Sequence, residues 1–350
     1  MKLRFISQLL IIIAVSLSVS SCQDQPEKSF QRRIYSFGTQ IDVTLYGIEQ
    51  AQADVAINKI EAQLDIMHIQ WHAWRKGSLT KLNEQLISGI PFRADDKVLP
   101  LVIESQQLYY KTKGLFNPAI GKLIELWGFY RDNPQDNLSI PPADQIKALL
   151  DSNPNMSNIL IAGNMLTGTN TDLQIDFGGY AKGYGVDRLV EQLKAQGINN
   201  ALINAGGDLR AIGRHGDRAW KIAIQDPDAE QPLGWLELTD DESVFSSGDY
   251  RRNFIKDGKS YHHIIDPRTG YPSENAKSVT VIYGNGAVAD AAATALMVAR
   301  PDEWLAIAKN IGLKYIFIVD KDGQLYSDEL FAKRIHLSDN KRIIRILGTL

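Results

Sequence analysis

The chain has 350 residues, which exceeds one typical domain and indicates one large domain or two interlocked halves. Hydrophobic residues make up 44% of it and charged residues 23%, and these near-average values argue against a disordered, collagenous or coiled-coil protein. The formal net charge is −3, so we expect no broadly basic surface and no nucleic acid as partner.

The N-terminus has the pattern of an export signal. Lys2 and Arg4 give a short positive region, and the mostly apolar residues 9–19 follow it. That stretch is too short to cross a hydrocarbon core of about 30 Å as a permanent helix, but it suits a signal peptide. It ends in a Val-Ser-Ser-Cys sequence that resembles a bacterial lipobox, where the peptide is cut before a lipid-carrying cysteine. Cys22 is the only cysteine, which excludes an intramolecular disulfide and a zinc cluster of cysteines.

We therefore expect residues 1–21 to be a lipoprotein signal peptide, Cys22 to carry lipid, and the polar residues 22–33 to be a tether. The folded part would lie on the periplasmic side of a bacterial membrane, anchored by lipid rather than by a spanning segment. Gln23 stands where inner-membrane retention calls for aspartate, which favours the outer membrane. The alternative is an ordinary signal peptide in which Cys22 has no role.

The first half of the chain combines an expected strand with amphipathic helices. Apolar residues alternate at Ile41, Val43 and Leu45, and from residue 55 to residue 67 they recur with a helical period. The expected elements are a strand at 35–46, helices at 52–70 and 97–112, an aromatic loop with a short helix at 114–130, and a surface connection at 131–144.

The second half is richer in strands. We expect strands at 172–177, 201–204, 220–225, 235–238, 278–283 and 315–319, helices at 181–196 and 288–299, and a tight turn at 320–323. Strands and helices are mixed without strict alternation. This favours an α+β fold, with mixed or antiparallel sheets and packed helices, over a doubly wound sheet.

Two glycine motifs follow expected strands and allow a close approach of the backbone to a ligand. Asp176 precedes Gly178, Gly179 and Lys182 at the start of an expected helix, where amides and the helix dipole favour a phosphate. The spacing is not that of a P-loop. A second glycine pair precedes Asp208. For both motifs the alternative is a plain capped turn, with Lys182 solvated.

Two further motifs carry groups suited to proton transfer and metal binding. His262 and His263 point to opposite sides if extended, so at most one of them faces a site. A histidine is a plausible base for a hydroxyl near neutral pH. Asp290 and Thr294 share one face of an expected helix, and their hard oxygen donors suit Mg²⁺. The alternatives are a solvated histidine at a strand edge and an aspartate that only stabilises a helix start.

Aromatic residues offer a surface on which a flat ring can stack. Trp71 and Trp74 lie three residues apart, and the segments 116–118 and 127–129 add an aromatic loop. Ordinary core packing is the alternative.

Together, these motifs occur in an order that resembles the ApbE family of FAD:protein FMN transferases, which are periplasmic lipoproteins in many bacteria. The resemblance covers about residues 34–330. It implies a single large ApbE-like, T-fold-like domain at 34–335, with a tail at 336–350. It rests on residues 37–39, Ser78 with Asn83, and residues 114–129, 176–187, 204–208, 247–250, 263–270 and 290–296.

The resemblance implies a Mg²⁺-dependent transfer reaction. FAD binds with Mg²⁺ at its pyrophosphate, and a threonine hydroxyl of a target protein attacks the FMN-side phosphate. AMP leaves, and FMN stays on the target through a phosphoester bond. The metal would neutralise phosphoryl charge, and a base would remove the threonine proton. The resemblance implies an acceptor protein as partner. The acceptors of this family tend to be subunits of membrane redox complexes.

The resemblance also implies roles for particular residues. The metal ligands are Asp290, Thr294 and the carbonyl of Gly179. His263 is expected to be the base, so His263 and Asp290 form the expected catalytic pair. The expected contacts to FAD come from Phe37, Trp74, Leu115, Phe116, Asn117, Asp176, Lys182, His263 and Ile264.

Three positions depart from the family pattern. Phe37 stands for the usual Met, Trp74 for a frequent Tyr, and Asn117 for the usual Asp, which loses a charge but keeps an acceptor. These changes bear on FAD affinity rather than on the reaction class. Two alternatives stay open: an FAD pyrophosphatase that releases FMN and AMP, and a flavin-binding lipoprotein without activity. The aromatic Trp74 favours transfer.

Overall fold

The computed structural model describes residues 28–131, 139–238 and 241–350. The expected signal peptide, Cys22 and the tether as far as residue 27 lie outside the described residues, as do residues 132–138 of the expected surface connection. Within the described ranges, no helix combines the length and the apolar character needed to cross a membrane.

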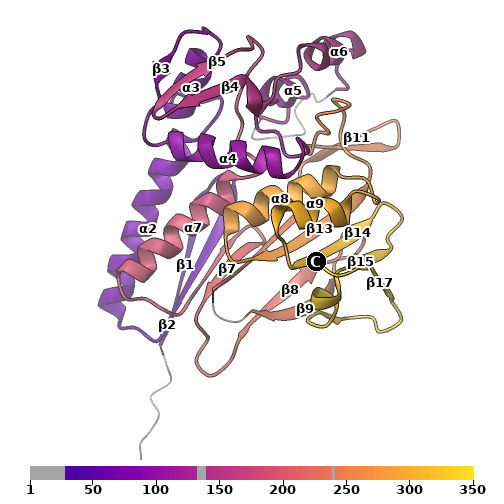
Figure 1. Cartoon of the computed structure of the whole chain (residues 1–350). Coiled ribbons are helices and arrows are strands. Elements are labelled where there is room, and N and C mark those ends of the chain that lie inside the picture. Colours follow the sequence, from indigo (N-terminus) through magenta and orange to yellow (C-terminus); the bar gives the residue numbers. More distant parts are fainter. Residues whose placement is uncertain (1–27, 132–138, 239–240) are drawn as a thin grey trace, which may run out of the picture.

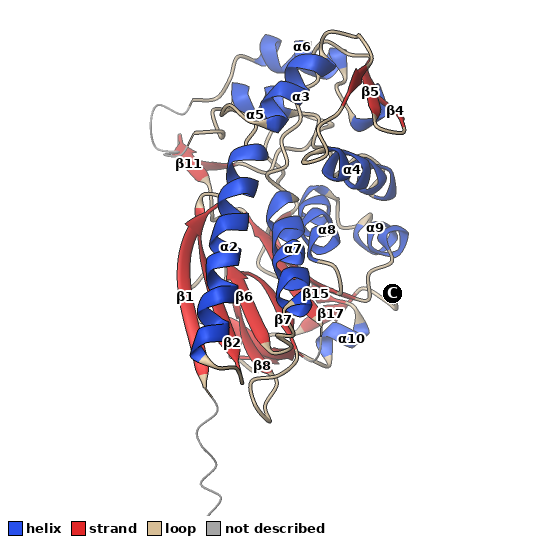
Figure 2. Ribbon diagram, turned by 90° about the vertical axis from the view of Figure 1, so that its left-hand side faces the viewer, coloured by secondary structure: helices blue, strands red, loops and turns tan. Residues whose placement is uncertain are grey.

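A nine-stranded sheet runs through the molecule, and long helices cover one of its faces (Figures 1 and 2). Among the described residues its neighbouring strands are antiparallel, except for β15 with β17 at one edge. In spatial order the strands are β1 (Ser29–Ser36), β2 (Thr39–Tyr46), β6 (Ala201–Ala205), β7 (Asp208–Ile212), β10 (Glu242–Gly248), β13 (Ala276–Tyr283), β14 (Tyr315–Asp320), β15 (Leu325–Ser327) and β17 (Ile344–Ile346). The covering helices are α2 (Gln50–Gln70), α7 (Ala181–Ala195), α8 (Gly286–Val298) and α9 (Trp304–Ile311). The expected α+β fold is confirmed.

A smaller group of elements lies at one end of the sheet, at the top of Figure 1. The sequence predicted the helix at 97–112 and the short helix in the 114–130 loop, but not the other elements of this group. They are α3 (Ser78–Leu86), α4 (Leu99–Lys111), α5 (Gly121–Leu126), α6 (Ala143–Ser152), a 3₁₀ turn at Met156–Asn158, and a sheet of β3 (Phe92–Arg93), β5 (Met165–Gly168) and β4 (Ile159–Ala162).

A second core lies on the sheet face away from the long helices. Buried residues of the nine-stranded sheet, such as Leu209 and Phe317, pack there against Trp220 and Leu236. The elements on this side and at the rim are β8 (Trp220–Gln225), β9 (Pro232–Leu238), β16 (His336–Leu337), α10 (Glu329–Ala332), and the hairpin of β11 (Asn253–Lys256) and β12 (Lys259–His262).

The strand expected at 35–46 is a hairpin. β1 ends at Ser36 and β2 begins at Thr39, and between them Phe37 and Gly38 have φ angles of 52° and 68°. Two consecutive positive φ angles are the geometry of a tight hairpin turn. The sequence did not predict this turn, because its two residues are not the Asn-Gly or Asp-Gly pair typical of such turns. The turn directs Phe37 toward the site described below.

The strand expected at 172–177 is absent. Gln174 makes only an isolated bridge with Ile120. The side chain of Asn83 takes the place of a partner strand, because its Nδ2 donates to the Ile175 carbonyl at 3.0 Å and its Oδ1 accepts from the Ile175 amide at 2.8 Å. The apolar alternation of this segment therefore reflects burial without a sheet.

Both ends of the described chain take part in sheets. Residues 29–33, expected in the tether, belong to β1, which pairs with β2. Residues of the expected tail at 336–350 form β16 and β17, which pair with β9 and β15. Edge strands often carry charged residues, so the polar sequence of residues 29–33 did not reveal the start of β1.

Asp187 fixes the start of α8 relative to α7. Its carboxylate is 3% exposed and accepts hydrogen bonds from the amides of Gly286 at 2.8 Å and Ala287 at 3.0 Å. The same carboxylate pairs with Arg210 of β7. One buried group therefore joins two helices to the sheet and sets the point from which Asp290 projects.

Replacing Asp187 with asparagine is expected to lower the free energy of unfolding by about 3 kcal/mol, because Arg210 loses its buried charged partner and keeps only the partly exposed Asp241. Urea denaturation followed by tryptophan fluorescence measures this loss. Asp241→Asn is the matched control. Asp241 also pairs with Arg210, but its side chain is 41% exposed, so the expected loss is about 1 kcal/mol or less. Equal losses in the two variants would contradict the weight given to burial.

Candidate active site

A cavity of about 680 Å³ lies where the upper group of elements meets the sheet, α7 and α8. Every candidate site residue within the described chain lines it, although these residues are spread over most of the sequence. They are Phe37, Trp74, Leu115, Phe116, Asn117, Asp176, Gly179, Lys182, His263, Ile264, Asp290 and Thr294. The structure therefore brings the whole set together, with Cys22 outside the described residues.

Oxygen donors gather at one corner of this cavity. A Cβ added to Gly179 would lie 2.8 Å from the Oγ1 of Thr294, so the Gly179 backbone faces that hydroxyl at close range. Ser247 Oγ lies 3.5 Å from the same hydroxyl. Asp290, one turn earlier on α8, is 4% exposed, and its Oδ2 accepts from the Gly183 amide at 3.0 Å.

This corner fits a divalent cation of the Mg²⁺ type. Burial raises the pKa of the Asp290 carboxyl, which means that its negative charge is under-compensated in the protein alone. Lys182 Nζ lies 3.8 Å from Asp290 Oδ1, too far for a hydrogen bond. Among the described residues, no group of three or more His, Cys, Asp or Glu side chains forms a metal cage. A few protein oxygens that leave room for water and phosphate oxygens are typical of Mg²⁺.

His263 follows directly after β12. Its backbone amide donates to the carbonyl oxygen of Arg252 at 3.0 Å, and its Nδ1 lies 3.3 Å from the same oxygen. A carbonyl oxygen only accepts, so Nδ1 carries the proton and Nε2 is the accepting nitrogen. Burial lowers the pKa of His263 to about 3, so the ring is neutral near pH 7.

His262 faces away from this cavity. It is 5% exposed, and its Nε2 bonds to the carbonyl of Ser273 at 2.7 Å. The expectation that at most one of the adjacent histidines faces a site agrees with this arrangement.

Aromatic rings build one wall of the cavity. Phe37 stacks on Trp71, with ring centroids 6.0 Å apart and planes at 16°, and Trp74 lies 5.5 Å from Tyr130. The Trp74 amide donates to His72 Nδ1 at 3.1 Å, which holds the backbone after α2. These faces suit a flat heteroaromatic ring. Buried apolar residues extend the same lining: Leu115, Phe116 and Ile264.

Two polar residues near this wall, Asn117 and Asp176, differ in how many of their hydrogen-bonding groups are already used within the protein. Asn117 shapes its own loop, because its Oδ1 accepts from the Ala119 amide at 3.2 Å and its Nδ2 donates to the Pro154 carbonyl at 3.0 Å. Asp176 accepts from the Gly178 amide at 3.1 Å, and burial raises its pKa to about 6. Asp176 is therefore the better placed of the two for an added ligand donor.

Sequence reasoning missed two cations of this cavity, Arg251 and Arg252. Both line it, beside Lys182. They follow the Ser-Ser-Gly-Asp-Tyr motif at 246–250, so the segment was visible, but no periodicity shows where an arginine after a turn will point.

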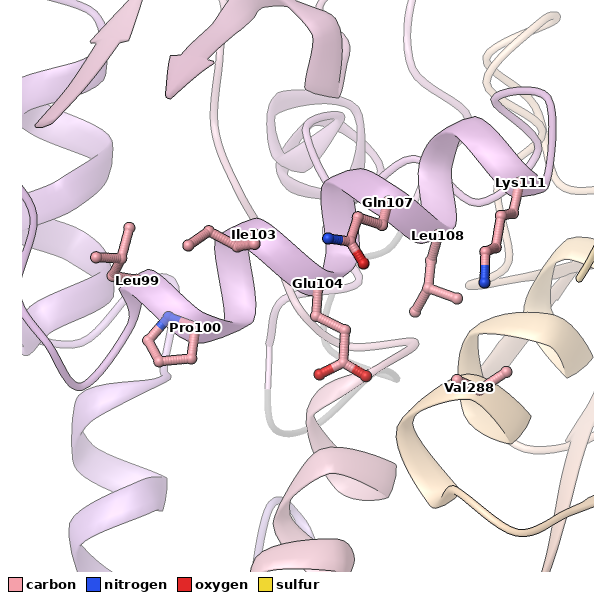
Figure 3. Close-up of a pocket in the computed structure, with 8 residues that line it drawn as sticks. All are labelled: Leu99, Pro100, Ile103, Glu104, Gln107, Leu108, Lys111 and Val288. Carbon is pink, nitrogen blue, oxygen red and sulfur yellow. The ribbon is translucent and has the colours of Figure 1, made fainter. Parts of the chain in front are cut away.

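A separate cavity of about 560 Å³ lies between α4 and the first turn of α8 (Figure 3). Leu99, Ile103, Glu104 and Lys111 line it from α4, and Val288 lines it from α8. Figure 3 shows the Glu104 carboxylate pointing from α4 into that space, and burial raises its pKa. No candidate residue lines this cavity, so the candidate site is the larger one.

Comparison with known proteins identifies the family of this chain. A model of the ApbE family matches residues 37–317, a range that contains every candidate residue of the cavity. The chain belongs to the ApbE family. It is 37% identical to an FAD:protein FMN transferase of Rhodobacter capsulatus, over 89% of this chain and 59% of that protein. It is 31% identical to an FAD:protein FMN transferase of Vibrio cholerae, over 89% and 94%. The ApbE chain thus spans about three fifths of the first relative and nearly all of the second.

Solved ApbE structures have the same fold. The crystal structure of the ApbE protein from Thermotoga maritima superposes with a TM-score of 0.80 and 28% identity, over 88% of this chain and 99% of that one. The flavin transferase ApbE from Vibrio cholerae gives 0.77 and 28%, over 88% and 100%. The fold is therefore that of a single ApbE domain.

Proposed function

We propose that this ApbE-family protein transfers FMN from FAD to a threonine hydroxyl of an acceptor protein. The threonine oxygen bonds to the FMN-side phosphorus, the phosphoanhydride bond breaks, and AMP leaves with the bridging oxygen. The acceptor keeps FMN through a phosphoester bond. The observation that carries this proposal is the convergence of a stacking wall, an oxygen-donor corner and a neutral histidine in one cavity.

His263 is suited to take the threonine proton. Because Nδ1 donates to the Arg252 carbonyl, Nε2 receives the proton as the hydroxyl attacks. The low pKa keeps this nitrogen unprotonated before the reaction. The negative charge of bound FAD shifts that pKa upward, toward the range in which proton transfer is efficient.

Asp290, Thr294 and the Gly179 carbonyl would hold a Mg²⁺ ion. When bound, the ion neutralises phosphoryl charge and favours an in-line displacement. Lys182 adds a positive charge beside this corner, and the aromatic wall holds the flavin ring. Together, these residues would hold the flavin ring and the diphosphate of FAD in a fixed orientation.

The direct test is a mass measurement on an acceptor. The purified protein is incubated with FAD and Mg²⁺, with and without a redox-subunit domain that carries a candidate threonine. We expect the acceptor to gain the mass of one FMN phosphoester, and a threonine-to-valine acceptor to gain none. Free FMN and AMP without any gain would favour the pyrophosphatase instead. FAD that stays intact with a series of acceptors would favour a flavin carrier.

We also propose that a lipid on Cys22 anchors the enzyme on the periplasmic side of a bacterial membrane, with Gln23 favouring the outer one. Cys22→Ser is expected to move the protein from the membrane pellet to the soluble fraction, because the acyl chains supply the anchor. Fractionation and palmitate labelling measure this. Ser20→Ala keeps a small residue and the cysteine, so it should stay in the pellet. A Cys22→Ser protein that remains there would contradict the anchor.

A further inference from the structure

The polar end of the cavity holds an ion cluster of Lys182, Arg251, Asp208 and Asp290, in which the family resemblance gave a role to Lys182 and Asp290 but none to Asp208 or Arg251. Asp208, the first residue of β7, is 0% exposed. Its Oδ2 pairs with Lys182 and lies 3.5 Å from Nη1 of Arg251. Its Oδ1 accepts from the Ser246 amide at 3.0 Å. The two cations line the cavity, while the carboxylate lies behind them.

A glycine turn places the members of this cluster. Gly206 and Gly207, with φ angles of 66° and 95°, join β6 to β7, and Ala205 pairs with Asp208 across the turn. A Cβ on Gly207 would lie 2.9 Å from Nη2 of Arg251. The guanidinium of Arg251 therefore packs against the backbone of Gly207 on one side and lies near the buried carboxylate of Asp208 on another. Both features restrict where Arg251 can point.

The charges of the cluster suit a diphosphate. Lys182, Arg251, Asp208 and Asp290 sum to zero formal charge. A divalent cation at the Asp290 corner would make this sum +2, which is opposite in sign and equal in magnitude to the charge of the two phosphates of FAD. The planar guanidinium, with several N–H donors, is the side chain best matched to phosphate oxygens. The excess positive charge of the cluster with its cation would therefore lie next to the phosphates of FAD.

We infer that Arg251 binds the diphosphate of FAD, and that Asp208 is a positioning residue that aims Arg251 and Lys182 at it. This inference rests on the proposed function, because it takes FAD as the ligand. Asp208 also keeps the ammonium of Lys182 at 3.8 Å from Asp290. Without it, Lys182 would be drawn to Asp290 and away from the phosphates.

The first variant is Arg251→Gln, tested by fluorescence titration with FAD and with riboflavin in the absence of added metal. Loss of a charged hydrogen bond predicts a Kd for FAD about 10- to 100-fold higher. Riboflavin carries no phosphate, so its Kd should not change. Arg300→Gln removes an arginine whose side chain is 56% exposed, and it should leave both affinities unchanged.

The second variant, Asp208→Asn, separates positioning from a simple charge effect because the two predict opposite signs. If Asp208 acted only as a negative charge near the phosphates, its removal would tighten FAD binding. If it positions the two cations, its removal weakens FAD binding, by about tenfold. Asparagine keeps an acceptor for the Ser246 amide, so the turn is preserved. The melting temperature should fall, because the buried cations lose a charged partner, so an unchanged circular dichroism spectrum and an unchanged riboflavin affinity verify the fold.

The outcomes distinguish this inference from the proposed function. A wild-type protein that transfers FMN, together with variants that bind FAD as tightly as wild type, would overturn the inference alone. Tighter FAD binding by Asp208→Asn would overturn the positioning role. Equal losses of FAD and riboflavin affinity would overturn it too, because the damage would not be confined to the phosphate end. A wild-type protein that binds no FAD would overturn both proposals.

Discussion

Asp290→Asn is expected to lower the rate of FMN transfer by about 10³-fold at saturating FAD. Asparagine has the same shape and still accepts from the Gly183 amide, but it offers a neutral oxygen to a cation. Stabilisation of phosphoryl charge by a metal ion amounts to several kcal/mol, which corresponds to about three powers of ten in rate. The measurement is the time course of flavin fluorescence on the acceptor in denaturing gels, at several Mg²⁺ concentrations.

The matched control for Asp290 is Asp144→Asn, which removes the same charge from the first turn of α6. Asp144 does not line the site cavity, so its variant should transfer FMN at the wild-type rate. If Asp290→Asn also kept the full rate at low Mg²⁺, the proposed metal corner would be wrong.

His263→Asn is expected to slow transfer by about 10²- to 10⁴-fold, the usual contribution of a general base. The asparagine Nδ2 can replace the Nδ1 donor to the Arg252 carbonyl, so the backbone there should stay in place while the proton acceptor is lost. FAD affinity should change much less than the transfer rate. Single-turnover transfer and FAD titration on the same sample separate these two quantities.

The pH profile gives the His263 assignment a second readout. Burial lowers its pKa to about 3, and a base is active above its pKa. With Mg²⁺ and acceptor saturating, kcat/KM for FAD reports the FAD-free enzyme and should therefore lack the acidic limb near pH 6.5 that an exposed histidine would give. His336→Asn, on β16 outside the cavity, is the control for rate. A limb near pH 6.5 that disappears in His263→Asn would show a solvated base instead.

Short-range patterns predicted the parts of the site that one element determines. Asp290 and Thr294 fall on one face of α8 because the helical period puts residues i and i+4 together. The adjacent histidines split between cavity and core because an extended chain alternates its side chains. The placement of the α8 corner beside Gly179 came only from the family resemblance.

Features that depend on tertiary contacts escaped the sequence. The two turn residues, Phe37 and Gly38, are not a typical hairpin pair, so nothing marked the hairpin there. The side chain of Asn83 pairs with the backbone of Ile175 where a partner strand would otherwise pair, and no propensity encodes this contact. Asp208 resembled a turn cap, and its burial depends on cations that come from distant segments.

The cavity takes its walls from the β1–β2 turn, the upper group of elements, α7 and α8. A ligand bound by all of these elements stabilises the protein against global unfolding, and not only against the opening of one loop. A ligand specific for the folded state, at 100 times its Kd, adds about 2.7 kcal/mol to the free energy of unfolding. Flavin loading should therefore register as a higher melting temperature without any acceptor present. It should also lengthen the life of the protein in the presence of proteases, which would tie its abundance to the flavin supply around it.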